Sequence, residues 1–240
     1  MDKTAIRNAA TVIMVRDAQH DPRILMGQRG SKAAFMPNKF VFPGGAVDVG
    51  DAGIPLATPL QDRCIAQLSH ETAPALIPAL APAAIREVWE ETGLILGESG
   101  TWPTPPPQDW ASFAAAGYLP SAAGLTFVFR AITPPGRPRR FDARFFMVDA
   151  DQQVCGDLDD FTHACDELSH LQWIRLDEVH HFDLPFITQV VMAEVADLVR
   201  NGKTPETVPF FRNDDEESLF LRLGAGGAGL KDPGPKQQTS

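Results

Sequence analysis

One short stretch, residues 83–94 (AAIREVWEETGL), constrains this chain most, because it combines a helical apolar period with three carboxylates. At about 100° per residue, Glu90 and Glu91 follow Glu87 by three and four positions and share its side of a helix. The opposite side is apolar, so we expect a helix with a buried back and an acidic front. Pro82 suits the first turn of this helix, and Gly93 suits the left-handed residue that ends it.

The acidic front carries more charge than its own helix balances. Like charges three or four residues apart repel by roughly 0.2–0.5 kcal/mol per pair, and Arg86 is the nearby cation that can offset them. An isolated acidic run is most often a solvated surface. A net negative cluster also suits Mg²⁺ or Mn²⁺, hard cations that prefer oxygen ligands. The segment upstream decides between these interpretations.

A glycine turn precedes the acidic helix. Residues 40–51 (FVFPGGAVDVGD) are typical of a short apolar strand that runs into a Gly-Gly turn. Together with the acidic stretch they resemble the Nudix box, which has a glycine, five residues, an acid, seven residues and then Arg-Glu-apolar-x-Glu-Glu-x-Gly-apolar. The matching positions are Gly45, Asp51, Arg86, Glu87, Val88, Glu90, Glu91, Gly93 and Leu94.

The match departs from the motif in two ways. The first acid is Asp51, where the family usually has glutamate, and 34 residues separate it from Arg86. Lengthening a surface loop costs only about 0.6 kcal/mol per doubling, so the two halves can still meet in space. The insertion, residues 52–81, is expected to contain a helix near 60–69 and to dock on the body as a flap. His70 and Glu71 could then reach the acidic front, although a solvated helix end is the commoner outcome.

The resemblance implies a role for each of these residues. Glu87, Glu90 and Glu91, with the Gly45 carbonyl, would hold one or more Mg²⁺ or Mn²⁺ ions. Arg86 would hold a box carboxylate in position rather than touch substrate. Glu90, Glu91 and Glu167 are candidates for the general base, and the sequence does not choose among them.

Apolar runs elsewhere predict the rest of the fold. Strands are expected at residues 10–15, 24–28, 40–42, 125–132, 144–149 and 171–174, with a long amphipathic helix at 185–200. This order matches the α/β/α sandwich of the Nudix fold, with a mixed sheet. We expect one domain over residues 1–223 and a disordered, Gly- and Pro-rich tail at 224–240.

A narrower resemblance points to the branch that includes the mammalian peroxisomal coenzyme A diphosphatase. It rests on Gln28-Arg29, Phe35-Met36-Pro37, residues 41–45 (VFPGG), Asp51, Thr133-Pro134 and residues 139–146 (RRFDARFF). Within these segments and beside them, Arg29, Lys39, Arg139 and Arg140 are candidates for substrate phosphate, with the arginine-rich segment 137–144 the densest positive cluster. Phe35 and Phe141 are candidates for stacking on a base or bordering an acyl or pantetheine arm. The competing interpretations are ordinary surface charge and core packing.

Composition limits the partners and the location. The formal net charge is −10 and the pI about 5.0, so nucleic acid polymers and anionic membrane surfaces would be repelled. Bound metal and local arginines can reverse this field for a small phosphorylated substrate. Three cysteines without a C-x-x-C pair favour a reducing compartment, and the cytoplasm is the expected location. The oligomeric state is open, and a homodimer is one option.

The resemblance therefore implies a Mg²⁺-dependent hydrolase of the diphosphate linkage in a nucleoside diphosphate joined to another group. Coenzyme A or acyl-CoA is the substrate that we expect first. ADP-ribose, a nucleotide sugar or an oxidised nucleotide would need the same chemistry. The hypothesis from a different class is a ligand-sensing domain without hydrolysis; the intact Arg-Glu-x-x-Glu-Glu argues against it, and Asp51 argues weakly for it.

Overall fold

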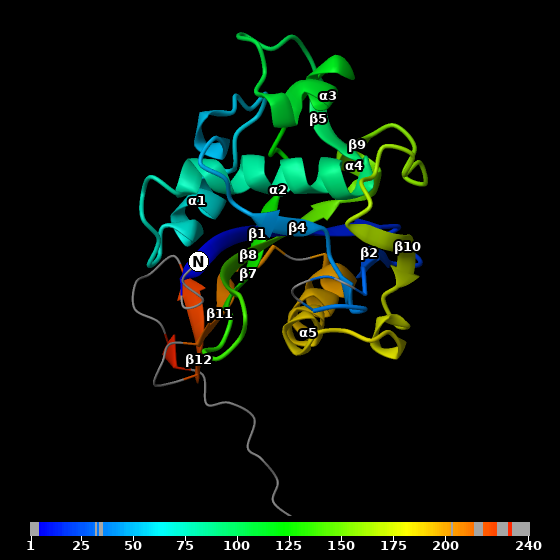
Figure 1. The fold of residues 1–240 in the computed structure, drawn as a ribbon. Coiled ribbons are helices and arrows are strands. Elements are labelled where there is room, and N and C mark those ends of the chain that lie inside the picture. Colours follow the sequence, from blue (N-terminus) through cyan, green and yellow to red (C-terminus); the bar gives the residue numbers. More distant parts are fainter. Residues whose placement is uncertain are drawn as a thin grey trace, which may run out of the picture.

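The computed structural model describes residues 5–31, 33, 36–202, 204–213, 218–224 and 230–231. They form a mixed sheet with helices on both faces, so the expected α/β fold is confirmed (Figure 1). The helices are α1 (Asp62–Leu68), α2 (Ile77–Thr92), α3 (Ala111–Ala115), α4 (Ala150–Gln153) and α5 (Phe186–Asn201), with 3-10 turns at Asp51–Gly53, Gln108–Trp110 and Val179–His181.

The main sheet has the strand order β10-β2-β1-β8-β7-β11-β12-β13, with β3 paired to β2 and β4 paired to β1. Its strands are β1 (Ile6–Arg16), β2 (Arg23–Arg29), β3 (Phe40–Val41), β4 (Gly44–Ala46), β7 (Thr126–Ile132), β8 (Arg140–Asp149), β10 (Leu168–Arg175), β11 (Thr207–Asn213), β12 (Ser218–Gly224) and β13 (Leu230–Lys231). The pairs β1–β8 and β7–β11 are parallel, and the others are antiparallel. A smaller sheet contains β6 (Tyr118–Pro120), β5 (Ile95–Ser99) and β9 (Val154–Cys155).

Strand β1 lies between two apolar cores, because its alternate side chains point to opposite faces. Ala10, Val12 and Met14 belong to the core that includes α2. Ile13 and Val15 belong to the core that includes α5. Burial on both faces explains why residues 9–15 are apolar except for Thr11, rather than alternating between apolar and polar.

The acidic helix is longer than the sequence predicted. It begins at Ile77, so Pro82 lies inside it, and Pro78 occupies its N-terminal turn. The expectation that Pro82 marks the first turn is therefore wrong. Residues 79–81 are buried, and this burial offsets the roughly 3 kcal/mol that a proline costs inside a helix. Gly93 ends the helix with φ 76° and donates its N–H to the Trp89 carbonyl, as expected.

Residues 52–81 pack on the α2 side of the sheet, where Ile54, Leu60 and Leu68 enter the core. Helix α1 falls within the range predicted for it. The carbonyls of His70 and Glu71 accept hydrogen bonds from Arg130 of β7, and the Glu71 carboxylate faces Arg212 of β11. These two residues therefore contact β7 and β11 and not the acidic front.

The C-terminal part contains a hairpin that the sequence analysis missed. Strands β11 and β12 pair from Thr207 with Gly224 to Asn213 with Ser218. Gly224, expected to begin the tail, is the last residue of β12, and residues 230–231 form β13. The other tail residues, 225–229 and 232–240, lie outside the described part of the chain. No helix among the described residues is long and apolar enough to cross a membrane.

We expect Gly93→Ala to lower the free energy of unfolding by more than the roughly 1 kcal/mol typical of a left-handed alanine. The added Cβ would lie 3.0 Å from the Cβ of His163, in addition to the unfavourable φ of 76°. Gly136→Ala is the matched control, because Gly136 has φ 79° with no atom within 4 Å of the added Cβ. Urea unfolding of both variants measures the difference. Equal losses would show that the contact with His163 contributes nothing.

Candidate functional site

The glycine turn and the acidic helix are in direct contact. Gly45 pairs with Ala10 of β1, which places β4 beneath α2. The Gly44 N–H donates to Oε2 of Glu91 at 2.7 Å. A Cβ built on Gly45 would lie only 2.5 Å from the Glu87 carboxyl group, so no larger residue fits there without displacing that side chain. Two segments more than forty positions apart thus form one surface.

Arg86 links this turn to the helix and to the chain that follows β4. Its Nε and Nη2 donate to the two carboxylate oxygens of Asp51 at 3.1 and 3.2 Å, and Nη2 also donates to the Ala46 carbonyl at 3.0 Å. Its Nη1 donates to Glu87 at 3.0 Å and to Glu90 at 3.2 Å. Burial alone would lower the pKa of Arg86, but hydrogen bonds to Asp51 and the nearby carboxylates raise it above its ordinary value. The guanidinium is therefore charged at every physiological pH.

Asp51 is a partner of Arg86 and is almost fully buried, at 2% exposure. It also accepts a hydrogen bond from the Asp48 N–H at 2.8 Å, which closes the turn that begins the 34-residue excursion. In this arrangement both oxygens of the Asp51 carboxylate accept hydrogen bonds from the guanidinium of Arg86. Its contacts are those of a residue that positions Arg86.

The three helical carboxyl groups are electrostatically strained. Burial raises the pKa of Glu87 to about 7, against the opposing effect of Arg86 and with a further increase from Glu90. Burial also raises the pKa of Glu90, and it raises that of Glu91 well above the usual range despite the Gly44 hydrogen bond. Burial therefore disfavours full ionisation of the three carboxyl groups, and a nearby cation would favour it.

The segment before β10 closes the other side of the cluster. The Cys165 N–H donates to the Glu90 carbonyl at 2.8 Å, and the His163 ring stacks on Trp89 at 5.6 Å. Glu167 accepts from Arg29 at 2.8 Å, and its charge raises the pKa of both Glu87 and Glu91. The structure thus brings Glu167 and Arg29 beside the helical acids.

The other predicted substrate residues have protein partners of their own, are exposed in a loop, or lie outside the described residues. Lys39 forms an ion pair with Asp183. Arg140 donates to the Thr133 and Asn213 carbonyls at 3.0 and 3.1 Å, and the Phe141 N–H donates to the Thr133 hydroxyl. Arg139 is exposed at the end of the loop before β8, and Phe35 is outside the described residues. Substrate contact by these residues stays a prediction.

Register along β1 shows how far the arginine-rich segment lies from the glycine turn. Arg140 pairs with Ile6, whereas Gly45 pairs with Ala10, four residues further along the strand. At about 3.3 Å per residue this separation is roughly 13 Å. The structure therefore does not bring Arg140 to the carboxylates of α2.

A buried ion network near that segment was missed in the sequence. Arg130 and Arg144 both contact the Asp142 carboxylate, at 2.7 and 3.1 Å. Burial lowers the pKa of Arg144 to about 10, with Arg130 contributing in the same direction and Asp142 opposing it. The signal that could have revealed the network is a charged residue, Arg130, inside the apolar strand 125–132.

We expect Asp51→Asn to lower the free energy of unfolding by about 3 kcal/mol, because it leaves a buried guanidinium without its main counter-charge. Asp48→Asn is the matched control: Asp48 approaches Arg86 at 3.5 Å and its side chain is 57% exposed. Its loss should stay below about 1 kcal/mol. Chemical denaturation of both variants tests this, and similar losses would contradict a special role for Asp51.

Metal-free protein should lose stability as the pH rises from about 4.5 to 7. In this window folded Glu87, with its pKa near 7, holds a proton that the unfolded chain has released, so rising pH favours unfolding. Glu87 alone can contribute up to about 3 kcal/mol. Unfolding free energies in EDTA, measured across this range for the wild type and Glu87→Gln, should diverge in slope. Parallel profiles would refute the raised pKa.

No family model matches the chain. A Caenorhabditis elegans protein named nudix hydrolase 7 is 30% identical over 181 residues, which cover 70% of this chain and 51% of that protein. The chain thus spans about half the length of this curated relative. The crystal structure of a NUDIX hydrolase from Alicyclobacillus acidocaldarius has a TM-score of 0.54 and 26% identity, over 82% of this chain and 96% of that chain.

A weaker likeness, with a TM-score of 0.46 and 11% identity over 81% of this chain and 88% of the other, is to the NUDIX domain of Shewanella oneidensis NrtR, crystallised with ADP ribose. At that level it carries no argument about function. The first two similarities agree with the motif that Gly45 and the α2 acids form. In sequence and in fold, the chain is therefore similar to Nudix hydrolases.

Proposed function

We propose that this protein hydrolyses the diphosphate linkage of a nucleoside diphosphate derivative, with a divalent cation such as Mg²⁺ as cofactor. The observation that carries the proposal is the packing of the Gly44-Gly45 turn against Glu87 and Glu91, with Arg86 holding Glu87 and Glu90. A binding module would not need this many buried, poorly compensated carboxylates beside one glycine turn. The arrangement favours a catalytic site over a ligand sensor.

The residues present fit a divalent cation in their chemistry. No three His, Cys, Asp or Glu side chains within the described ranges are already arranged to hold a metal ion. The donors that would hold it are the carboxylates of Glu87, Glu90 and Glu91 and the Gly45 carbonyl, all oxygen ligands. Burial raises the pKa of each of these carboxyl groups, and a bound cation would favour their ionised form. When bound, the cation would neutralise phosphate charge and lower the pKa of a water molecule.

The protein's own groups would orient the metal-binding carboxylates and remove a proton from the water molecule. The Gly44 N–H fixes one oxygen of Glu91, and Arg86 fixes one oxygen each of Glu87 and Glu90. Glu167, held by Arg29 and 54% exposed, is the more accessible candidate for the general base. Glu91 is buried and its pKa is raised well above the usual range, which suits a base only if a cation lowers that pKa.

For the substrate we propose coenzyme A or an acyl-CoA. Support comes from the sequence resemblance of residues 28–51 and 133–146 to the coenzyme A diphosphatase branch and from the interruption between Asp51 and Arg86. Purified protein with Mg²⁺ should be tested against CoA, acyl-CoAs, ADP-ribose, nucleotide sugars and nucleoside triphosphates, with products identified by mass. Release of 3′,5′-ADP from CoA supports the proposal. Turnover of other diphosphates alone would reject the CoA assignment and keep the hydrolase.

Glu90→Gln and Glu91→Gln should each lower turnover of the preferred substrate by about a hundredfold or more. Glu91→Gln should not lower stability at pH 8, because glutamine keeps an acceptor for the Gly44 N–H and removes a buried charge. Glu178→Gln, at a side chain 58% exposed, is the control and should leave turnover unchanged. Steady-state kinetics and thermal unfolding measure both effects. Undiminished turnover in both α2 variants would show that the metal assignment is wrong.

A further inference from the structure

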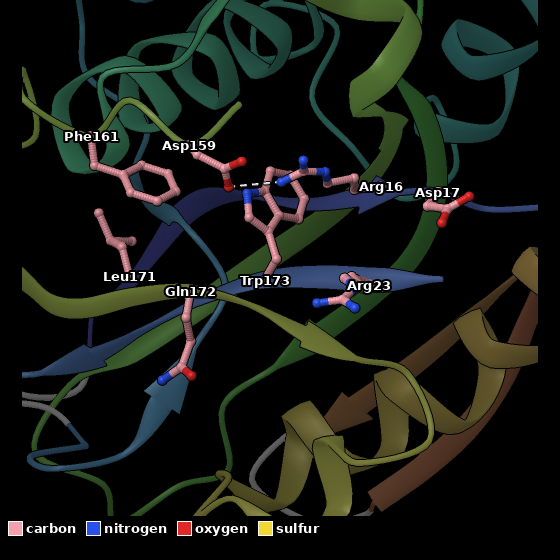
Figure 2. A pocket seen from close by; sticks show the side chains of 8 residues that line it. All are labelled: Arg16, Asp17, Arg23, Asp159, Phe161, Leu171, Gln172 and Trp173. Carbon is pink, nitrogen blue, oxygen red and sulfur yellow. Dashed lines mark hydrogen bonds and ion pairs between the residues drawn. The ribbon is translucent and has the colours of Figure 1, made fainter. Parts of the chain in front are cut away.

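An open groove lies beside the segment that borders the acid cluster. It has a volume of about 700 Å³ and is formed by the end of β1, the start of β2, β10 and the chain before β10 (Figure 2). The lining residues are Arg16, Asp17, Arg23, Asp159, Phe161, Leu171, Gln172 and Trp173. This volume is in the range of small-molecule sites.

The groove combines flat faces with one donor and acceptor pair. Figure 2 shows Phe161 projecting from the chain before β10 and Trp173 projecting from β10, with the guanidinium of Arg16 near the indole. That guanidinium lies 5.7 Å from the Trp173 ring centroid and donates to Oδ1 of Asp159 at 2.7 Å. Aromatic rings and guanidinium planes are the surfaces on which nucleobases stack.

The groove and the acid cluster are joined by a short piece of chain. Phe161 lines the groove, whereas Cys165 is hydrogen-bonded to Glu90 and Glu167 is paired with Arg29. On β10, Leu168 pairs with Arg29 and Leu171 lines the groove. A bulge between Ser169 and Gln172 keeps the two leucines close together, and side-chain atoms of both lie within 3.0 Å of a Cβ built on Gly27. A ribose could bridge a diphosphate at the acids and a ring in the groove.

We propose that this groove binds the base of the substrate, a purine with an exocyclic amino group. This inference rests on the proposed function, because the diphosphate would lie at the acid cluster. The ring would stack against Phe161, its amino group would donate to the 58% exposed Asp159 carboxylate, and Arg16 would donate to a ring nitrogen. Four of the eight lining side chains are charged, which disfavours an acyl or pantetheine arm as the occupant.

The test is calorimetric binding of AMP, IMP and ribose 5-phosphate to the intact protein with Mg²⁺. Phe161→Ala should weaken AMP binding about tenfold, the loss expected for one stacked ring, and should leave ribose 5-phosphate binding unchanged. Phe161→Tyr should restore AMP binding. Phe186→Ala removes an aromatic ring that is 68% exposed on α5, away from the groove, and should have no effect. Equal weakening of AMP and ribose 5-phosphate, or no AMP binding by the wild type, would overturn the proposal.

The proposed hydrogen bond between Asp159 and the amino group is tested separately from stacking, by comparing AMP with IMP. The wild type should bind AMP more tightly than IMP, which has a carbonyl in place of the amino group, and Asp159→Asn should abolish this preference. A preference that survives Asp159→Asn would remove Asp159 from base recognition. Neither measurement needs turnover. Selective AMP binding without hydrolysis of any diphosphate would contradict the proposed hydrolase activity and support base binding in the groove. Hydrolysis without base selectivity would support the hydrolase activity and contradict base binding in the groove.

Discussion

The buried guanidinium of Arg86 is the constraint on which this site depends. Taking a charge out of water costs several kcal/mol unless hydrogen-bonded counter-charges surround it. Here the acceptors come from three separate segments: the Ala46 carbonyl of β4, the Asp51 carboxylate and the α2 acids themselves. One side chain thereby fixes the positions of β4, the turn at Asp51–Gly53 and α2 relative to one another.

The same side chain supplies one positive charge to several carboxylates. Arg86 is shared among Asp51, Glu87 and Glu90, while Glu91 takes its hydrogen bond from the neutral Gly44 amide. A fold selected only for stability would replace one of these acids with an uncharged residue. The retained carboxyl groups, each with a raised pKa, are better explained by cation binding than by the stability of the fold.

The predictable parts of this structure depend on local spacing. The shared face of the α2 acids, the left-handed Gly93 and the paired strands β1 and β2 follow from helical and strand periods that the sequence displays. The start of α2 does not follow, because burial of residues 79–81 extends the helix through Pro82. In the same way, the pairing of Asp51 with Arg86 is a tertiary contact, which the spacing of residues in the sequence does not predict.

The arginine-rich segment shows that charge density in sequence does not reveal which charged side chains are buried. Strand alternation puts Arg140, Asp142 and Arg144 on one face of β8, and all three are buried. Arg130 and Arg144 there both contact Asp142, and Arg140 donates to backbone carbonyls. The hairpin of β11 and β12 was missed for a related reason, since its place in the sheet depends on pairing with the distant strand β7.

The long excursion between Asp51 and Arg86 is tolerated because its entropic cost is small beside what the chain recovers. Extending a connection from seven to 34 residues is about two doublings, or roughly 1.2 kcal/mol. Separating a buried ion pair such as Asp51 and Arg86 would cost about 3–5 kcal/mol. The excursion also buries Ile54, Leu60 and Leu68, each worth about 1.5–3 kcal/mol. The excursion therefore adds to the packing around the site while both of its ends stay fixed by one guanidinium.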